Sequence, residues 1–388
     1  MSSIKSLDAG IIADSRGDKT IEVSLHLDDG RLVLASVPQG KSRGSFEAVY
    51  TESETAVNNI KDIISPALAG LDVYDQAGID NKMIELDGTF GKSKLGANAL
   101  LAVSIASAKA AALDADVPLW RHLRKLYGKT DQPQHSPRLF ANIINGGLHA
   151  DNGLPFQEYM VIPKSVNAQE SFESVRNIYN AVKNIMVTDG REYKIGDEGG
   201  FAPVFENSYE PFEVLRKASA NAGLEGKIDF GLDAAASNVK MNAEELYNIY
   251  EKMKNDHGLW YLEDPFSEDD FENFSSLRKK MGGDVIVAGD DLTVTNLKRM
   301  EKAKESDSIN GIIIKPNQIG TVSETLDAIR QAKDWNWTIV ISHRSGETMD
   351  DFIADLAFAV EADGLKAGAP SQKERLAKYE RLIRIENS

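Results

Sequence analysis

The chain contains no cysteine, and this absence excludes several kinds of site. Without cysteine, no disulfide, thiolate nucleophile or zinc–sulfur site can form. The first ten residues, "MSSIKSLDAG", also lack the apolar core of a secretory signal. We therefore expect a cytoplasmic protein.

Basic charge is in short supply, with 44 Lys and Arg residues against 60 Asp and Glu residues and a net charge of −16. This balance disfavours binding to nucleic acid or to an anionic membrane, so a small anionic substrate would need a locally basic pocket. Long apolar runs are missing too. The most membrane-like segment, residues 99–120, carries Lys109, Asp114 and Asp116, which predicts a buried helix of small residues.

What is present is enough chain for two domains: 388 residues, 42% hydrophobic and 27% charged. Residues 1–36 alternate in polarity as three strands do, with a turn near Asp29 and Gly30. Helical patterns follow over 54–71 and 96–113, and the polar, proline-rich stretch 129–137 is the best candidate for a linker. The sequence thus predicts one domain over residues 1–130 and another over 137–388.

The second of these stretches has about the 250 residues typical of an eight-stranded α/β barrel. Seven short apolar runs in it each end in an ionisable residue, at successive intervals of 35, 30, 27, 25, 28 and 23 residues. These end residues are Glu198, Asp233, Glu263, Asp290, Lys315, His343 and Lys366. Helical patterns such as 242–254, 323–335 and 347–362 lie between the runs. A parallel barrel places the carboxyl ends of its strands on one face, so we expect these side chains to surround an active site. Ordinary βα turns with solvated charges would explain one or two of them, but not seven.

Three carboxylates, Asp233, Glu263 and Asp290, end consecutive runs. Carboxylates crowded together raise one another's pKa unless a cation joins them. Oxygen ligands without His or Cys indicate Mg²⁺, with water or substrate in the remaining positions. The alternative is an acidic rim on the surface.

Lys315 follows the buried run "GIII" and precedes the turn "PNQIG". Burial and a nearby divalent metal both disfavour the protonated form of a lysine, which would lower its pKa. Lys315 is therefore a candidate general base for a proton beside a carboxylate. A lysine that merely extends its amine to the rim is the alternative.

The stretch "SHRSGE" offers His343, Arg344 and Ser345, a set suited to a phosphate or a carboxylate, and Lys366 adds another cation. A histidine at a strand end can equally be a hydrogen-bonded structural residue, so His343 is ambiguous by itself.

Opposite these groups, Glu198 in "GDEGGFAP" and Glu158 in "FQEYM" are candidate general acids that would protonate a leaving hydroxyl. The whole set indicates a carbon acid that a lysine deprotonates. A metal would hold the resulting dianion, and a hydroxyl would leave with help from a carboxyl group.

A series of motifs then gives the chain a strong resemblance to the enolases, or phosphopyruvate hydratases, over almost its whole length. A single match such as "EDPF" would be weak, but so many in order, with barrel spacing, are highly specific. The motifs are "DSRG", "KSKLGANA", "NIINGGLHADN", "FQEYM", "GDEGGFAP", "GLDAAAS", "EDPF", "GDDLTVTN", "KPNQIGT", "SHRSGET" and "LKAGAPSQKERLAKYERLIRIE".

The resemblance implies an α/β fold of the enolase type. A small N-terminal α+β domain caps a barrel of eight strands whose first part is antiparallel, usually in a homodimer or a higher homo-oligomer. It also implies the reversible dehydration of 2-phosphoglycerate to phosphoenolpyruvate, with two Mg²⁺ ions per active site.

The resemblance further assigns a role to each matching residue. Asp233, Glu263 and Asp290 match the ligands of the tightly bound metal, and Ser42 matches the serine that binds the second metal along with substrate phosphate. Lys315 matches the base at C2, and Glu198, supported by Glu158, matches the acid for the C3 hydroxyl. The positions that contact substrate are matched by Gln157, His343, Arg344, Ser345, Lys366 and His149, the last of which we count among the catalytic residues.

The sequence departs from the family pattern at lids and edges. The loop that usually reads like "PSGAST" is "PQGKSR" here, Leu148 replaces a common polar residue, and Asn238 stands where Glu is usual. Lys41 and Arg43 add cationic charge to that loop. They either attract a phosphorylated anion or point to solvent without effect.

Two other functions remain open at this point. One is a paralogue that abstracts a proton from another small phosphorylated or carboxylated acid, which the altered loop favours. The other is a catalytically silent scaffold that binds protein partners. An incomplete site would mark the scaffold, and every residue of the site is present.

Overall fold

The chain begins with a small antiparallel sheet. The computed structural model describes residues 2–41 and 44–387, and its first three strands are β1 (Ile4–Ala13), β2 (Lys19–Leu27) and β3 (Leu32–Ser36), in the order β1-β2-β3. Alternation sets the buried face, because Ile21, Val23, Leu25 and Leu27 of β2 are all fully buried. The predicted three-stranded meander is confirmed, and Gly30 turns the chain between β2 and β3 with φ 92°.

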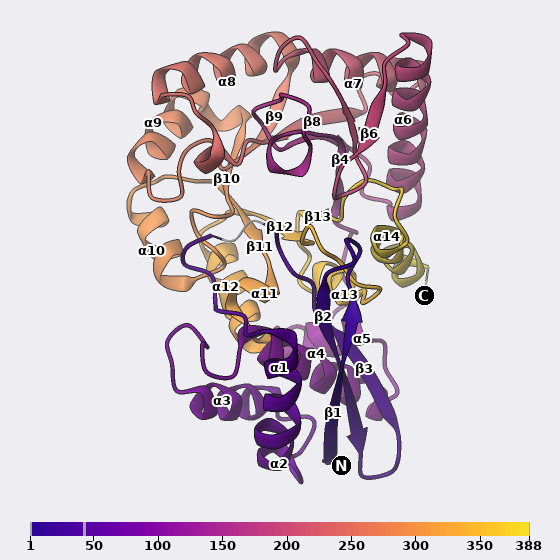
Figure 1. The fold of residues 1–388 in the computed structure, drawn as a ribbon, viewed down its shortest axis with the longest axis vertical. Helices are drawn as coiled ribbons and strands as arrows, with labels where there is room; N and C mark the ends of the chain where they lie inside the picture. Colours follow the sequence, from indigo (N-terminus) through magenta and orange to yellow (C-terminus); the bar gives the residue numbers. More distant parts are fainter. Residues whose placement is uncertain (1, 42–43, 388) are drawn as a thin grey trace.

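Helices cover one side of this sheet (Figure 1). The predicted helix over 54–71 is confirmed as a continuous helical stretch made of α1 (Ser53–Asn59), η1 (Ile60–Ile64) and α2 (Ser65–Leu68). After α3 (Gln76–Asp87) come α4 (Ala97–Asp114) and α5 (Leu119–Leu126). By length and hydropathy α4 is a candidate membrane span, but 83% of it is buried within the protein, so it is the core helix that its small residues predict.

Eight strands close the barrel. They are β4 (Arg138–Asn145), β5 (Glu158–Pro163), β8 (Ile228–Asp233), β9 (Leu259–Glu263), β10 (Ile286–Gly289), β11 (Gly311–Ile314), β12 (Thr338–Ser342) and β13 (Gly364–Lys366). The ring closes where β13 pairs in parallel with β4. Strand β5 is antiparallel to both of its neighbours, β4 and β8, and the other pairings are parallel. The predicted barrel with an antiparallel first part is confirmed.

One strand assignment from the sequence is wrong. The run that leads to Glu198 was expected to be a barrel strand, but β6 (Tyr193–Ile195) pairs with β7 (Phe201–Pro203) in a hairpin beside β4. The ring is already complete without it, and β6 has only three residues, two of them exposed. Glu198 therefore lies in the turn of this hairpin, where the amide of Gly196 donates to the carbonyl of Gly200 at 2.8 Å.

The long helices of the second part run around the outside of the barrel (Figure 1). They are α6 (Ala168–Thr188), α7 (Glu210–Asn221), α8 (Ala243–His257), α9 (Phe271–Met281), α10 (Leu297–Glu305), α12 (Val322–Asp334), α13 (Phe352–Ala359) and α14 (Lys373–Glu386). Short turns complete the set: η2 (Gly147–His149), η3 (Ala236–Asn238), η4 (Gly282–Asp284) and α11 (Pro316–Ile319). Helices predicted over 242–254 and 323–335 are present as α8 and α12.

The third predicted helix, 347–362, is helical only over α13. The amide of Phe352 donates to Asp350 at 3.0 Å, so the helix begins there. The other carboxylate oxygen of Asp350 accepts from Lys109 of α4 at 2.7 Å and from the amide of Ser36 at 2.9 Å. The residues before α13 thus join the barrel to the N-terminal helices. The proposed linker, 129–137, contains no helix or strand, and the domain boundary there stays a prediction.

Candidate active site

The polar strand ends meet at one end of the barrel. Asp233 and Glu263 stand side by side in the parallel pair β8 and β9. Strand β5 runs the other way, so its first residue, Glu158, lies opposite Asp233. This register brings three carboxylates together from strands that lie up to about a hundred residues apart in the chain. The expectation of one shared face is confirmed.

A buried ion cluster surrounds Lys366. Its Nζ lies 3.0 Å from Glu158 Oε2, 3.1 Å from Asp233 Oδ2 and 2.9 Å from Glu263 Oε1. Burial opposes the charge of this lysine, but the three carboxylates outweigh it and raise the pKa of Lys366 well above its usual value. Burial and the charge of Asp233 raise the pKa of Glu263 as well. Lys366 thus acts as the cation that a cluster of carboxylates requires.

A second ion pair joins Lys315 and Asp290. The Lys315 amine donates to Asp290 Oδ2, and Gln318 donates to Asp290 Oδ1 at 3.0 Å. Burial tends to lower the pKa of Lys315, as expected from the sequence, but the charge of Asp290 prevails and raises it. For the chain without a metal ion, the expectation that the pKa of Lys315 is lowered is therefore wrong. The predicted metal triad is also divided, because Asp233 and Glu263 contact Lys366 whereas Asp290 contacts Lys315.

Asp290 belongs to a second group of carboxylates that the sequence analysis did not assemble. Asp264 accepts hydrogen bonds from the amides of Asp290 and Asp291 at 2.9 and 2.7 Å. Ligand atoms of these three residues all lie within 4.8 Å of one another. Burial and the charge of Asp290 raise the pKa of Asp291 to about 7. The doublets "ED" and "DD" in the sequence were the available signal for Asp264 and Asp291.

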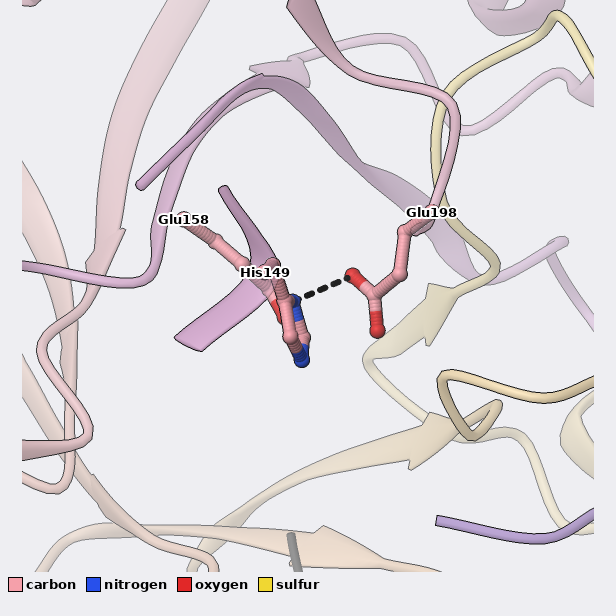
Figure 2. Close-up of side chains that lie close together, drawn as sticks. All are labelled: His149, Glu158 and Glu198. Carbon is pink, nitrogen blue, oxygen red and sulfur yellow. Dashed lines mark ion pairs between the residues drawn. The ribbon is translucent and has the colours of Figure 1, made fainter. Parts of the chain in front are cut away.

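The candidate acid groups form the other cluster (Figure 2). His149 ends η2, Glu158 begins β5, and Glu198 lies in the β6–β7 turn. Nδ1 of His149 lies 3.6 Å from Glu198 Oε2 and 4.0 Å from Glu158 Oε1. Burial and the charge of Glu198 raise the pKa of Glu158 to about 8, while burial lowers the pKa of His149. Asn142 of β4 donates a short hydrogen bond to Glu198.

The loop after β12 contributes three side chains. Nε2 of His343 lies 3.7 Å from Glu198 Oε2, so His343 adjoins the acid cluster. Arg344 forms a bidentate pair with Glu47, at 2.9 and 3.0 Å. Ser345 Oγ accepts from the backbone amide of Lys41 at 2.7 Å. These three consecutive residues thus contact three different parts of the chain.

The remaining predicted residues are placed as follows. A cavity opens among the strand ends, and Gln157, Asp233 and Asn238 all line it. Gln157 Nε2 donates to Asp233 Oδ2 at 3.4 Å. Glu263 is fully buried beside Lys366 and does not line that cavity. Ser42 and Arg43 lie outside the described residues. Among the described residues, every predicted site residue except Glu263 lines the cavity.

Two residues were missed for lack of a local signal. Glu47, the partner of Arg344, sits in the unremarkable stretch "FEAVY", and only the fold brings it 297 positions along the chain to that arginine. Arg375 lies within a quoted motif, but nothing in the motif shows that its side chain reaches the loop after β12.

The residues present fit a divalent cation of the Mg²⁺ type. Two of the predicted ligands, Asp233 and Glu263, converge with Glu158 on one ammonium group, so they are arranged to surround a positive charge. The third predicted ligand, Asp290, belongs to the group with Asp264 and Asp291 whose ligand atoms are close enough to hold a metal ion. Buried Gln157 Oε1 has no hydrogen-bond partner in the described part of the chain and offers a further oxygen. Carboxylate and amide oxygens without thiolates are the ligands that Mg²⁺ prefers.

The chain is similar to known proteins over almost its whole length. The family model for the enolase C-terminal TIM barrel domain matches residues 135–247 and 237–388, and that for the enolase N-terminal domain matches residues 4–123. Enolase 2 of Lactobacillus johnsonii is 44% identical over 403 aligned positions, covering 97% of this chain and 93% of the relative. The enolase of Solanum lycopersicum is 40% identical over 425 positions, covering 100% and 95%.

Proposed function

This chain belongs to the enolase family of hydro-lyases, the phosphopyruvate hydratases, and from that premise we propose how its residues dehydrate 2-phosphoglycerate to phosphoenolpyruvate. One observation carries the assignment of roles. Strands β5 and β11 stand four places apart in the eight-stranded ring, so Glu158 lies across the barrel from Lys315, and Glu198 lies beside Glu158. A base and an acid can therefore act on opposite faces of one bound substrate.

Lys315 is the base. Its amine must be neutral for this step, so a bound cation would have to neutralise the charge of Asp290, which raises the pKa of Lys315 in the chain by itself. The neutral Nζ takes the proton from C2 of the substrate, and the C–H electron pair is delocalised into the adjacent carboxylate. Asp290 accepts a hydrogen bond from Lys315 and a second one from Gln318. Asp290 and Gln318 therefore hold the lysine at the end of β11. Lys315 lines the cavity, so a substrate bound there contacts its amine.

Glu198 is the acid that completes the dehydration. The C3–O bond breaks as the C2–C3 double bond forms, and a proton from the carboxyl group converts the leaving hydroxyl into water. Glu158 supports this step, since its raised pKa of about 8 lets it hold a proton near neutral pH. His149, kept neutral by burial, lies between the two carboxyl groups without adding a charge.

The substrate's anionic groups are bound by the other residues of the cavity. Arg344 and Ser345 hold the phosphate, and His343, Gln157 and Lys366 position the remaining oxygens. Asp233, Glu263 and Asp290 would hold one Mg²⁺ ion, and Ser42 would hold a second. The charge of these ions would stabilise the carboxylate dianion.

A direct assay tests the proposal. Purified protein with Mg²⁺ and 2-phosphoglycerate should form phosphoenolpyruvate, followed by its ultraviolet absorbance. Its absence, with activity on another small phosphorylated or carboxylated acid, would assign the chain to a paralogue. No turnover of any such acid would favour a binding scaffold.

We also propose that the protein is a cytoplasmic homodimer or higher homo-oligomer. Its substrate is a metabolite, and the chain has no cysteine that an oxidising compartment would pair. Ile11 on β1 and Leu32 and Leu34 on β3 leave apolar surface exposed on the small sheet, which is available for an interface. Sedimentation equilibrium would measure the subunit number.

A further inference from the structure

The loop between β3 and α1 is tied to the barrel by its backbone. The amide of Gln39 donates to the carbonyl of Gly346 at 2.8 Å, and the amide of Gly346 donates back at 2.9 Å. The Tyr50 hydroxyl donates to the carbonyl of Pro38 at 3.1 Å. This part of the loop is therefore held beside the loop after β12 whatever the neighbouring side chains do.

The side chain of Lys41 leaves this anchored segment and lines an outer cavity together with Leu148 and Asp197. Its Nζ donates to the carbonyl of Leu148 at 3.0 Å and forms an ion pair with Asp197 Oδ2 at 2.9 Å. Its backbone amide donates to Ser345 at the same time. Lys41 is thus joined to three separate loops, and the alternative in which it points only to solvent is wrong.

The two residues that Nζ contacts each precede a residue of the acid cluster. Leu148 precedes His149 in η2, and Asp197 precedes Glu198 in the β6–β7 turn. The amide of Asp197 also donates to the carbonyl of His149 at 3.4 Å, so the two turns touch. One ammonium group therefore joins the backbone carbonyl before His149 to the carboxylate side chain of the residue before Glu198.

The chemistry of this contact favours a geometric role over a stabilising one. The side chains of Lys41 and Asp197 are 48% and 28% exposed, and an ion pair so accessible to water contributes little to folding stability. The same contact can still have a large effect on turnover if it holds the two turns at a fixed separation, because small displacements of reacting groups lower turnover strongly.

We propose that Lys41 is a positioning residue, which sets the separation of His149 and Glu198 by holding Leu148 and Asp197 together. The inference rests on the proposed function, because it acts through the acid of that reaction. It predicts an effect mainly on kcat. A lysine that merely attracted an anionic substrate would change KM instead.

Two variants of Lys41 and one matched control separate these effects. Lys41→Met removes the ammonium group but keeps the backbone hydrogen bond to Ser345, and Lys41→Arg restores a donor of similar reach. Lys194→Met is the control: Lys194 lines the same outer cavity as Lys41, and within residues 2–41 and 44–387 its side chain has no hydrogen bond or ion pair.

The expected result is a kcat about tenfold lower in Lys41→Met, with partial recovery in Lys41→Arg and no change in Lys194→Met. Asp197→Asn should lower kcat too, and the double variant should lose less than the two single losses multiplied. Equal kcat in Lys41→Met and the wild-type protein, or equal losses in Lys41→Met and Lys194→Met, would overturn the inference while leaving the enolase activity intact.

Amide hydrogen exchange gives a readout that does not depend on turnover. Exchange at residues 148–150 and 197–199 should rise in Lys41→Met and stay unchanged in Lys194→Met. Unchanged exchange in Lys41→Met would count against the inference even in a protein that forms no phosphoenolpyruvate, whereas missing activity in the wild-type protein would count only against the proposed function.

Discussion

The guanidinium of Arg375 donates a 2.5 Å hydrogen bond to Nδ1 of His343. An arginine can only donate, so Nδ1 is the accepting nitrogen and the proton of the neutral ring is on Nε2. That nitrogen lies 3.7 Å from Glu198. Burial and the charge of Arg375 lower the pKa of His343 well below its usual value, which keeps the ring neutral. A residue of α14 thereby determines which nitrogen of His343 presents a proton to the acid cluster.

Replacing Arg375 by lysine should impair turnover. Arg375 also donates to the carbonyls of Arg344 and Ser345, both at 2.6 Å, and one ammonium group cannot reproduce this planar set of donors. We expect Arg375→Lys to lower kcat by about tenfold or more. The kcat is calculated per folded protein, with the folded fraction measured by circular dichroism. Arg384→Lys, on the same helix but 64% exposed, is the control and should leave kcat unchanged. Full activity in Arg375→Lys would show that the planar set of donors is not required at this position.

Metal removal should abolish dehydration. Asp290 is one of three carboxylates proposed to hold Mg²⁺, so Asp290→Asn is expected to reduce kcat/KM by roughly 100-fold or more while the fold persists. Asp284→Asn removes the same charge at a side chain that is 86% exposed and should have no effect. Full activity in excess EDTA would mean that the metal assignment is wrong.

The base and the acid should separate in an isotope experiment. Lys315→Met is expected to abolish both dehydration and exchange of the C2 proton with solvent deuterium, because no group remains to take that proton. Glu198→Gln should abolish dehydration yet leave some exchange, since the acid acts after deprotonation. Nuclear magnetic resonance of 2-phosphoglycerate in deuterium oxide measures the exchange. Equal loss of exchange in both variants would contradict these roles.

The stability of the protein should fall in mild acid through His122. Burial lowers the pKa of this histidine to about 4 from 6.5, so the unfolded chain binds a proton that the folded chain does not. The contribution of His122 to the free energy of unfolding is complete above its pKa in the unfolded chain. It is lost as the pH falls, by about 1 kcal/mol at roughly pH 5.5.

Urea unfolding at about pH 7.5 and pH 5.5 measures this loss. His122→Leu has no proton to bind, so the difference between the two pH values should shrink by about 1 kcal/mol relative to the wild-type protein. His135→Gln, which replaces an exposed histidine, should leave the difference as it is. An unaltered difference in His122→Leu would exclude His122 as the group responsible.

A methyl group at residue 346 should disturb the contact between the β3–α1 loop and the barrel. A Cβ there would lie 1.9 Å from Asp14 Oδ2 and 2.8 Å from the carbonyl of Gln39, which is closer than atoms can pack. We expect Gly346→Ala to lower the free energy of unfolding by about 1–3 kcal/mol and to raise KM. Gly283→Ala meets nothing within 4 Å and should be tolerated. Wild-type stability and KM in Gly346→Ala would show that the loop can move aside.

The sequence predicts the small sheet, six of the eight barrel strands and most of the side chains that line the cavity. Period-two alternation predicted the small sheet, and the spacing of strand ends predicted the barrel, because both depend on local geometry that repeats along the chain. The same argument predicts that Asp233, Lys315 and Lys366 lie at one face of the barrel, and all three line the cavity. The motifs then restricted the chemistry to one family.

What the tertiary structure decided is which of these groups touch. It placed Glu198 in a hairpin outside the ring and paired Asp290 with Lys315. It also joined Lys41 and Arg375 to the site from distant segments. These contacts depend on the register of strands and on side chains that meet across the barrel, so no local pattern encodes them. The pKa of a buried group follows from its nearest charges, and for Lys315 that neighbour, 25 residues away in the chain, reversed the direction expected from burial alone.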